Sequence, residues 1–218
     1  MTMAPKHSAF TAARPAQLAA AFSWKRPLDI LVALAAIIVL SPVFLITVAL
    51  VGLTSKGGIF FRQTRVGKDG KRFGMLKFRS MYQDAEVRRA ALLGQSDRDG
   101  TTFKMKNDPR ITPFGRFIRR ASIDELPQLF NVLKGDMSLV GPRPALPSEV
   151  AAYPVYALER LNALPGITGV WQISGRADVS FDQMIDMDLA YVRGATLTID
   201  LMILWGTLGA VLTARGAY

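Results

Sequence analysis

Two adjacent carboxylates, Asp124 and Glu125, are the residues of this chain best suited to chemistry, because arginines stand on both sides of them. Arg119 and Arg120 come just before, and Arg143 follows in a Gly-Pro-Arg-Pro turn. The prolines beside Arg143 limit backbone motion, and a rigid guanidinium fork suits bidentate recognition of a phosphate group. The pattern therefore predicts chemistry on a phosphate.

Each candidate residue also has a purely structural explanation. Acidic residues at helix starts commonly act as caps, and capping would be the favoured role of Asp124 and Glu125 if no arginines stood nearby. Lys77 and Arg79 alternate along a predicted strand and so share one face, as the residues of a solvated strand also do. Asp188 falls at the spacing of the solvated face of an amphipathic helix. Alone, none of these residues identifies a site.

The composition narrows the possible chemistry. The chain has 218 residues, a formal net charge of +10, no cysteine and one histidine, His7. The absence of cysteine excludes thiol nucleophiles, disulfides and thiolate metal sites. His7 lies in a tail rich in Ala, Pro and Ser, predicted to be disordered over residues 1–23, so Ser-His catalysis is not expected. A metal would need oxygen ligands, which favours Mg²⁺ or Mn²⁺ over zinc.

One apolar stretch dominates the N-terminal part of the chain. It runs from Ile30 to Leu53 without a charged residue, and as a helix it would be about 36 Å long, enough to cross a bilayer. Pro42 divides it nearly in half, removing a helix hydrogen bond and kinking the chain, and Ser41 can bond to the carbonyls that are freed. Each half is then roughly 16–18 Å long, about half a bilayer.

The charges around this stretch bear on its topology. Basic residues occur on both sides, within positions 6–26 and 56–72. The positive-inside rule keeps both flanks in the cytoplasm, which a helix that enters and leaves by one face satisfies better than a straight span. A lone kinked span is the more common structure, so charge and proline leave the two topologies equally open. The sequence pI of about 10.2 suits anionic lipid head groups, and no nucleic-acid motif is present.

The rest of the chain, residues 56–218, is predicted to form one compact domain behind the membrane element of residues 24–55. Residues 59–61 and 73–78 read as strands joined by a turn at 67–70. Residues 84–93 read as a short helix, and Thr112-Pro113 as the cap and first position of another.

A helix is also expected near Ser122, in one of two registers. With Ser122 as N-cap, Glu125 completes a capping box but Pro127 clashes at the fifth helical position. With Asp124 as N-cap, Pro127 falls at the third position, which needs no donor, and we prefer this register. Gly135 ends the helix. The predicted buried face consists of Leu126, Leu129, Phe130 and Leu133.

Further helices are expected toward the C-terminus. Residues 156–163 read as a helix that stops at Leu-Pro-Gly, and Trp171 as a packing residue in a loop or short strand. Ser180 and Gln183 have capping-box spacing at the start of an amphipathic helix over 180–193. Residues 197–212 are mostly apolar and form either a core helix or one that lies in the membrane interface.

At the level of whole motifs, the chain resembles the bacterial sugar transferases, the monotopic polyprenol-phosphate phosphoglycosyl transferases. The resemblance covers nearly the whole chain and is carried in order by Lys25-Arg-Pro-Leu-Asp29, Ser41-Pro42, Phe60-Phe-Arg-Gln-Thr-Arg-Val-Gly67, Lys77-Phe-Arg-Ser-Met81, Asp108-Pro-Arg-Ile-Thr112, Ser122-Ile-Asp-Glu-Leu-Pro-Gln128, Leu133-Lys-Gly-Asp-Met-Ser-Leu-Val-Gly-Pro-Arg-Pro144 and Pro165-Gly-Ile-Thr-Gly169. Ile123 replaces a more usual Leu, and residues 82–107 match weakly. The multi-span N-terminal domain of larger relatives has no counterpart here, so we expect a minimal catalytic unit.

The resemblance implies a fold and a location. The fold would be α+β, a helix-rich compact cytoplasmic domain with a small sheet. A re-entrant membrane helix that turns at Ser41-Pro42, together with interfacial amphipathic helices, would anchor it. The protein would then be monotopic, on the cytoplasmic face of the bacterial inner membrane.

The resemblance also implies a two-step reaction with Mg²⁺ as cofactor. Asp124 would attack the β-phosphate of a UDP-sugar, release UMP and carry a covalent phospho-sugar, which undecaprenyl phosphate would then accept. Glu125 would help to hold Mg²⁺. Asp188 matches an acid of the family's site, and Arg176 would meet the nucleotide. The basic positions around the phosphates are matched by Lys77, Arg79, Arg119 and Arg143.

Two alternatives remain at this stage. One is direct transfer without a covalent intermediate, with Asp124 as a metal ligand, and the other is a basic membrane adaptor without enzymatic activity. Expected partners of the enzyme are the UDP-sugar, undecaprenyl phosphate, anionic lipids, a second copy in a homodimer and downstream glycosyltransferases, but no nucleic acid. Likeness to the exopolysaccharide-initiating subgroup suggests a hexose such as glucose or galactose.

Overall fold

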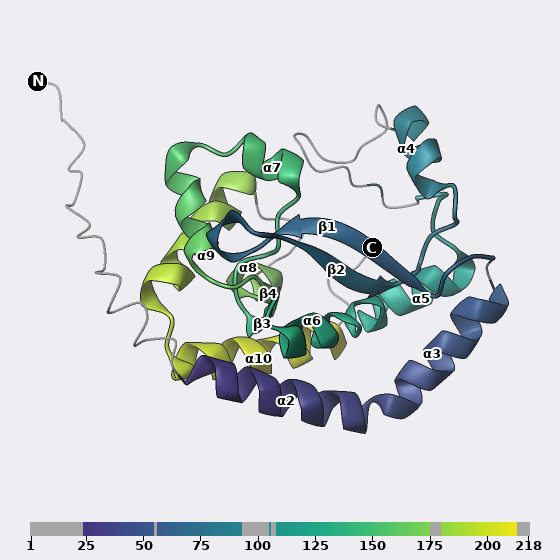
Figure 1. Ribbon diagram of the computed structural model, residues 1–218, viewed down its shortest axis with the longest axis horizontal. Coiled ribbons are helices and arrows are strands. Elements are labelled where there is room, and N and C mark those ends of the chain that lie inside the picture. The colour runs from purple at the N-terminus through teal and green to yellow at the C-terminus, as the bar shows by residue number, and fades with distance from the viewer. Residues whose placement is uncertain (1–23, 55, 93–104, 106–107, 175–179, 213–218) are drawn as a thin grey trace, which may run out of the picture.

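A β-hairpin runs through the middle of the fold, with helices on both sides of it (Figure 1). The computed structural model describes residues 24–54, 56–92, 105, 108–174 and 180–212. The hairpin pairs β1 (Phe60–Val66) with β2 (Arg72–Phe78) in antiparallel register, with Phe61 opposite Lys77. The two predicted strands and the turn between them are confirmed, although β1 continues well beyond the predicted residues 59–61.

A second, parallel pair of strands was not predicted. β3 (Ser138–Val140) pairs with β4 (Gly166–Thr168), and three residues are too few to show the alternation that marks a strand. Glycine is required where the two chains meet, because a Cβ built on Gly166 would lie 2.1 Å from the amide nitrogen of Gly141. The described residues therefore form two small sheets where the sequence predicted one.

The apolar stretch forms two helices, α2 (Lys25–Val39) and α3 (Ser41–Thr54), bent by 63° at the break between them. They make the angled arm at the bottom of Figure 1. The predicted break at Ser41-Pro42 is confirmed, since the bend lies at Leu40 directly before it. Of the described helices, none alone has the length and apolar character to cross a bilayer, and this bent pair meets that test only when taken together.

The arm is also part of the protein core. Ala33 in α2 and Phe44 and Val51 in α3 are buried in the largest hydrophobic cluster, which they share with both sheets and with the helices over them. The first turn of α2 is fixed to the end of a later helix, because the Arg26 guanidinium donates hydrogen bonds of 2.5 and 2.8 Å to the carbonyls of Val132 and Leu133.

Local capping signals place several of the other helices. Thr112 accepts a hydrogen bond from the amide of Gly115, 2.8 Å away, and Ser180 and Gln183 form the predicted capping box. Gly135 adopts the left-handed conformation (φ 94°) after the last helical residue, as predicted. The helices concerned and their neighbours are α4 (Ala85–Leu92), α5 (Pro113–Arg120), α6 (Gln128–Lys134), α7 (Pro147–Ala151), α8 (Val170–Ile173), α9 (Phe181–Gly194) and α10 (Leu197–Leu212).

Both registers predicted for the helix near Ser122 are wrong. Ser122 is left-handed (φ 56°, ψ 18°), whereas an N-cap residue is extended. A single 3₁₀ turn, η3 (Ile123–Glu125), follows, and α6 starts only after Pro127, whose ring nitrogen carries no proton for a helical hydrogen bond. The later start also moves the buried face, so that Phe130 is 43% exposed.

Two further predictions concern the C-terminal half of the chain. The helix predicted over residues 156–163 is present as a 3₁₀ helix, η4 (Val155–Asn162). Trp171 lies in α8 and not in a loop or strand. The predicted tail of residues 1–23 lies outside the described residues.

Candidate active site

Asp124 lies in the 3₁₀ turn η3, between α5 and α6, with 8% of its surface exposed. The left-handed Ser122 follows Ala121, the C-cap of α5, and the chain turns there into η3, whose second residue is the buried Asp124. Burial, and to a smaller extent the neighbouring Glu125, raise the pKa of Asp124 to about 6 although Lys77 and Arg119 oppose the shift. A carboxylate that is nearly buried yet ionised at neutral pH is well suited to act as a nucleophile.

Glu125 lies beside Asp124 and is held by the hairpin. Its Oε1 accepts a hydrogen bond of 2.7 Å from the Lys77 ammonium in β2. Both side chains remain partly exposed, so this carboxylate faces the surface while Asp124 faces inward. The structure therefore brings together three of the residues predicted from sequence.

Arg119 lies near the same pair, whereas the Arg79 guanidinium lies against Gly57. Arg119, in the last turn of α5, favours the ionised form of Asp124. The pKa of Asp108 is lowered mainly by its hydrogen bonds from Arg110 and to a smaller extent by Arg119. Arg79 follows β2 directly and is buried, and its amide donates to the carbonyl of Ile59 at 2.9 Å. We call Lys77, Arg119, Asp124 and Glu125 the carboxylate cluster.

Arg143 lies in a second group of charged residues, after β3. Its Nη1 is 3.1 Å from Oε2 of Glu149, which is almost fully buried and also accepts a hydrogen bond of 2.7 Å from the amide of Leu146 at the start of α7. Glu149 thus caps α7 and orients the Arg143 guanidinium. No local pattern singles out Glu149, which is the lone acid between Pro144 and Pro154.

Asp188 is buried, which corrects its predicted place on the solvated face of its helix. Its side chain and that of Arg160 in η4 are each 1% exposed and form an ion pair. Burial raises the pKa of Asp188 to about 6, although Arg160 and Arg143 both favour the ionised form. A sequence signal was available, because Asp188 falls at helical spacing between the apolar residues Ile185 and Val192.

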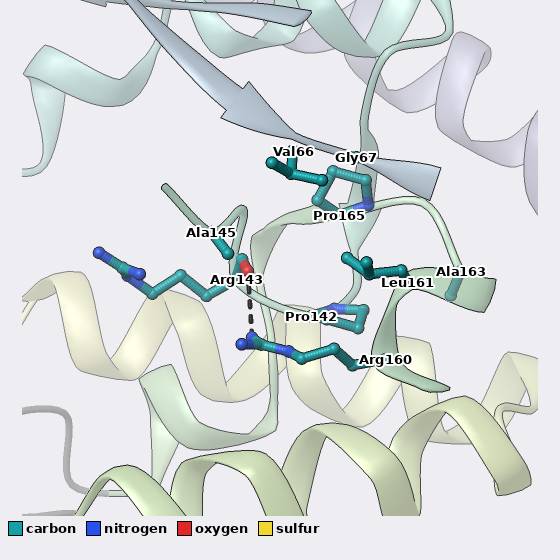
Figure 2. Close-up of a pocket in the computed structure, with 9 residues that line it drawn as sticks. All are labelled: Val66, Gly67, Pro142, Arg143, Ala145, Arg160, Leu161, Ala163 and Pro165. Atoms are coloured by element: carbon teal, nitrogen blue, oxygen red, sulfur yellow. Dashed lines mark hydrogen bonds between the residues drawn. The ribbon is translucent and has the colours of Figure 1, made fainter. Parts of the chain in front are cut away.

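A small cavity lies behind the Arg143 turn, between Val66 of β1 and Leu161 of η4 (Figure 2). Its volume is about 10 Å³, room for about one water molecule and far too little for a sugar nucleotide. Figure 2 shows the side chain of Arg143 extending away from this cavity. The guanidinium therefore lies on the side of the turn that faces away from the cavity.

Arg65 connects the two groups and was not predicted as a site residue from the sequence. It is buried in β1 and donates a hydrogen bond of 2.9 Å to the carbonyl of Pro144. Burial and the nearby Arg143 lower its pKa to about 10, while Glu149 and Glu125 act in the opposite direction. Arg65 thus interacts electrostatically with charged residues of both groups.

The oxygen donors of the carboxylate cluster fit a hard divalent cation. Within the part of the chain that the structure describes, no set of three or more His, Asp or Glu residues converges on one point. Mg²⁺ in proteins is commonly held by one or two carboxylates while phosphate oxygens and water complete its coordination. Asp124 and Glu125 offer such a pair. Arg176, the expected nucleotide contact, lies outside the described residues.

The chain matches a known family over almost its full length. The model of the family described as "Bacterial sugar transferase" matches residues 20–214. The chain is 41% identical over 198 residues to the exopolysaccharide production protein ExoY of Sinorhizobium fredii, covering 89% of this chain and 88% of that one.

Two longer relatives carry names that specify a reaction. The identity is 44% over 199 residues with the UDP-galactose-lipid carrier transferase of Erwinia amylovora, and 45% over 202 residues with the undecaprenyl-phosphate galactose phosphotransferase of Salmonella typhimurium. Each alignment covers 89% of this chain but only 41% of the relative. The chain thus belongs to the bacterial sugar transferase family and is an enzyme of the phosphoglycosyl transferase class.

Proposed function

We propose that this enzyme transfers a hexose-1-phosphate from a UDP-sugar to undecaprenyl phosphate, releasing UMP and starting the assembly of a polysaccharide. The names of the relatives from Erwinia and Salmonella support the donor and acceptor classes. The observation that carries the mechanism is the buried Asp124 carboxylate with Lys77 and Arg119 around it.

In the first step an Asp124 carboxylate oxygen attacks the β-phosphorus of the UDP-sugar. The bond from that phosphorus to the bridging oxygen breaks, UMP leaves with the electron pair, and an aspartyl phospho-sugar remains. Lys77 and Arg119 favour the ionised nucleophile before the attack and offset the negative charge that gathers on the phosphoryl oxygens during it.

In the second step a phosphate oxygen of undecaprenyl phosphate attacks the same phosphorus. The bond to Asp124 breaks, the carboxylate is restored and the lipid diphospho-sugar is formed. Arg143, held by Glu149, binds the phosphates of the donor in this scheme. Mg²⁺, when bound by Glu125, supplies further positive charge toward those phosphates. The Lys77 ammonium can move from Glu125 to phosphate because both side chains are partly exposed.

The acceptor's phosphate lies at a membrane surface, so the proposal includes membrane attachment at the cytoplasmic face through a re-entrant α2–α3 arm. Its support is the 63° bend and the apolar side chains that the arm leaves exposed, such as Leu31, Val39 and Leu53. Helix α10 lies beside α2 (Figure 1) and exposes Met202 and Trp205 in the same way. Such helices suit the interface between water and lipid.

The first test is release of UMP from a panel of UDP-sugars by detergent-purified protein, with Mg²⁺ and with or without polyprenyl phosphate. Release that depends on the lipid and on one sugar supports the proposal and identifies the donor. A panel in which no UDP-sugar yields UMP, with active protein from the Salmonella relative as positive control, refutes it.

A second experiment separates the two mechanisms. The enzyme is incubated with a sugar nucleotide labelled in its β-phosphate, without lipid, and is then denatured. Label that stays on the wild-type chain, and is absent from Asp124→Asn, supports the covalent intermediate. Unlabelled protein that still forms lipid product on addition of polyprenyl phosphate means direct transfer.

A further inference from the structure

The backbone of Arg143 is held by one ion pair. The carbonyl of Arg143 accepts a hydrogen bond of 3.1 Å from Nη2 of Arg160 (Figure 2). Arg160 also bonds to Asp188, whose carboxylate lies close enough to the Arg143 amide for that amide to favour its ionised form. The ion pair therefore supports the Arg143 turn from behind.

The prolines on either side of Arg143 explain why this support of its backbone matters. Pro142 and Pro144 fix their own φ angles and carry no amide proton, but they leave the φ and ψ of Arg143 free to vary within the extended region. The hydrogen bond from Arg160 to the Arg143 carbonyl, with Asp188 close to the Arg143 amide, supplies that missing constraint. Arg65 holds the next carbonyl, that of Pro144, at 2.9 Å, so the turn is fixed from two directions.

The ion pair is well suited to act as a rigid support. Both side chains are 1% exposed, and a buried pair is stable only when its remaining donors and acceptors are also satisfied. Nη1 of Arg160 donates to the Tyr153 hydroxyl, and the guanidinium carbon lies 5.4 Å from the centre of that ring. The pair joins η4 to α9, two elements on one side of the Arg143 turn.

Neither Arg160 nor Asp188 can contact a ligand that the Arg143 guanidinium binds. Both are enclosed, whereas Figure 2 shows the Arg143 side chain extending from the turn away from Arg160. The family resemblance suggested that Asp188 contacts the substrate, but here it lies behind the turn, on the backbone side of Arg143.

We propose that Arg160 and Asp188 are positioning residues, which fix the direction in which Arg143 presents its guanidinium to the phosphates of the sugar nucleotide. The identity of that ligand rests on the proposed function, while the positioning itself does not. A displacement of about 1 Å in a group that binds the reacting phosphate lowers rates by up to about 100-fold. The pair therefore controls donor use without touching the donor.

The kinetic test is a double-mutant cycle with Arg160→Lys and Arg143→Lys. Lysine at 160 keeps a positive charge for Asp188, but a single ammonium cannot hold Asp188, the Arg143 carbonyl and Tyr153 together as a guanidinium does. We expect each single variant to lower kcat/KM for the donor by about tenfold, chiefly through a higher KM. The kcat/KM of the double variant should lie within about threefold of that of Arg143→Lys. Independent effects, with a loss of about 100-fold in the double variant, overturn the proposal.

The chain contains a matched control in Arg193→Lys. Arg193 pairs with Glu159 across the same two elements, η4 and α9, but on the protein surface. This variant makes the same chemical change between the same elements without reaching the Arg143 turn. We expect its KM for the donor to equal that of the wild type. If it matches Arg160→Lys, the effect comes from the packing of the elements and not from the turn.

Hydrogen exchange gives a readout that needs no substrate. Between Gly141 and Ala145, Arg143 carries the only backbone amide proton, so its exchange reports directly on how firmly this turn is held. We expect about tenfold faster exchange at Arg143 in Arg160→Lys, and wild-type exchange in Arg193→Lys. Unchanged exchange in Arg160→Lys overturns the positioning role.

The same readout keeps the two proposals separate. Faster exchange in an enzyme that releases no UMP from any sugar means that the proposed reaction is wrong while the positioning role stands. Should Arg160→Lys fail to fold, Tyr153→Phe removes only the hydroxyl that holds Arg160, and a smaller acceleration at Arg143 is expected. No acceleration in a folded Tyr153→Phe variant then counts against the proposal.

Discussion

The hydroxyl of Ser41 donates a hydrogen bond of 2.8 Å to the carbonyl of Ile38. That carbonyl is the one that would accept from residue 42 in a continuous helix, and Pro42 has no proton to donate. Ser41 therefore satisfies the group that Pro42 leaves open. The bend between α2 and α3 thus carries no unsatisfied backbone group at Ile38, as the apolar interior of a membrane demands.

Replacing the proline should change the topology of the arm. Pro42→Ala restores the missing donor, so we expect one straight helix that carries the N-terminus to the opposite side of the membrane from residues 56–218. The chain has no cysteine, so Ser8→Cys provides a unique site for a membrane-impermeant thiol label. Pro113→Ala, at the start of a helix in the main domain, should leave labelling unchanged. A label pattern equal to the wild type in Pro42→Ala would contradict the re-entrant arrangement.

The stability of the protein should depend on pH through Asp124. Its pKa in the folded state is about 6, above the ordinary value of 3.8, because burial disfavours the charge. Between these two values the unfolded chain is the more ionised, so the favourable contribution present below pH 4 is lost as the pH rises through about 6. Asp124→Asn removes this loss and should be more stable than the wild type at pH 8 by roughly 1–3 kcal/mol.

Thermal unfolding in EDTA, at pH values from 4 to 8, measures this difference. We expect the two melting temperatures to converge toward pH 4, while the variant forms no lipid product at any pH. Asp84→Asn, at an exposed position, serves as the control. A gap between wild type and Asp124→Asn that stays constant with pH would show that the charge of Asp124 is not what destabilises the fold.

Glu125 should determine the Mg²⁺ concentration that the reaction requires. Glu125→Gln keeps the shape of the side chain but removes the charge, and we expect about a tenfold rise in the Mg²⁺ concentration that gives half-maximal UMP release. Asp69→Asn, an exposed acid at the tip of the hairpin, should leave the Mg²⁺ curve in place. If Glu125→Gln lowers the rate equally at all Mg²⁺ concentrations, the carboxylate does not hold the metal.

The hydrogen bonds of Arg26 between α2 and α6 should contribute to the stability of the folded protein. It donates to the carbonyls of Val132 and Leu133 at the end of α6, and losing two hydrogen bonds from a charged donor costs about 2 kcal/mol. We expect Arg26→Ala to lower the free energy of unfolding by that amount in a denaturant titration. Arg116→Ala, an exposed arginine of α5, should change it by no more than about 0.5 kcal/mol.

Trp205 should report on the contact between α10 and lipid. It is 78% exposed, whereas the indole nitrogen of Trp171 is buried. In vesicles that contain brominated lipid, we expect Trp205→Phe to abolish most of the quenching of tryptophan fluorescence, and Trp171→Phe to retain it. Equal quenching in both variants would mean that α10 does not face the membrane.

The features that sequence predicted well depend on neighbours in the chain. The Thr112-Pro113 helix start, the Ser180–Gln183 capping box and the left-handed Gly135 are all confirmed because each depends on contacts within about one helical turn. The same local reasoning failed at Ser122, where two cap signals competed. Neither signal reveals that tertiary packing would place this serine in the left-handed conformation.

The features that sequence missed are contacts between distant segments. Arg160 and Asp188 are 28 positions apart, and nothing in either local pattern indicates their pairing. The candidate nucleophile was predicted correctly as a residue of interest, because Asp124 and Glu125 stand out beside the arginines. The burial of Asp124 was not predicted, because it depends on how α5, η3 and α6 pack around this residue.

The shared core of the arm and the main domain has a practical consequence for anyone who wishes to make a soluble form of this enzyme. Phe44 and Val51 of α3 are buried against residues of the hairpin and α6, and Phe44 contacts the ring of Phe78 at 5.5 Å between centroids. A chain that starts at residue 56 would expose that surface to water. Solubility will have to come from replacing the outward side chains of α2, α3 and α10, while both helices of the arm are kept.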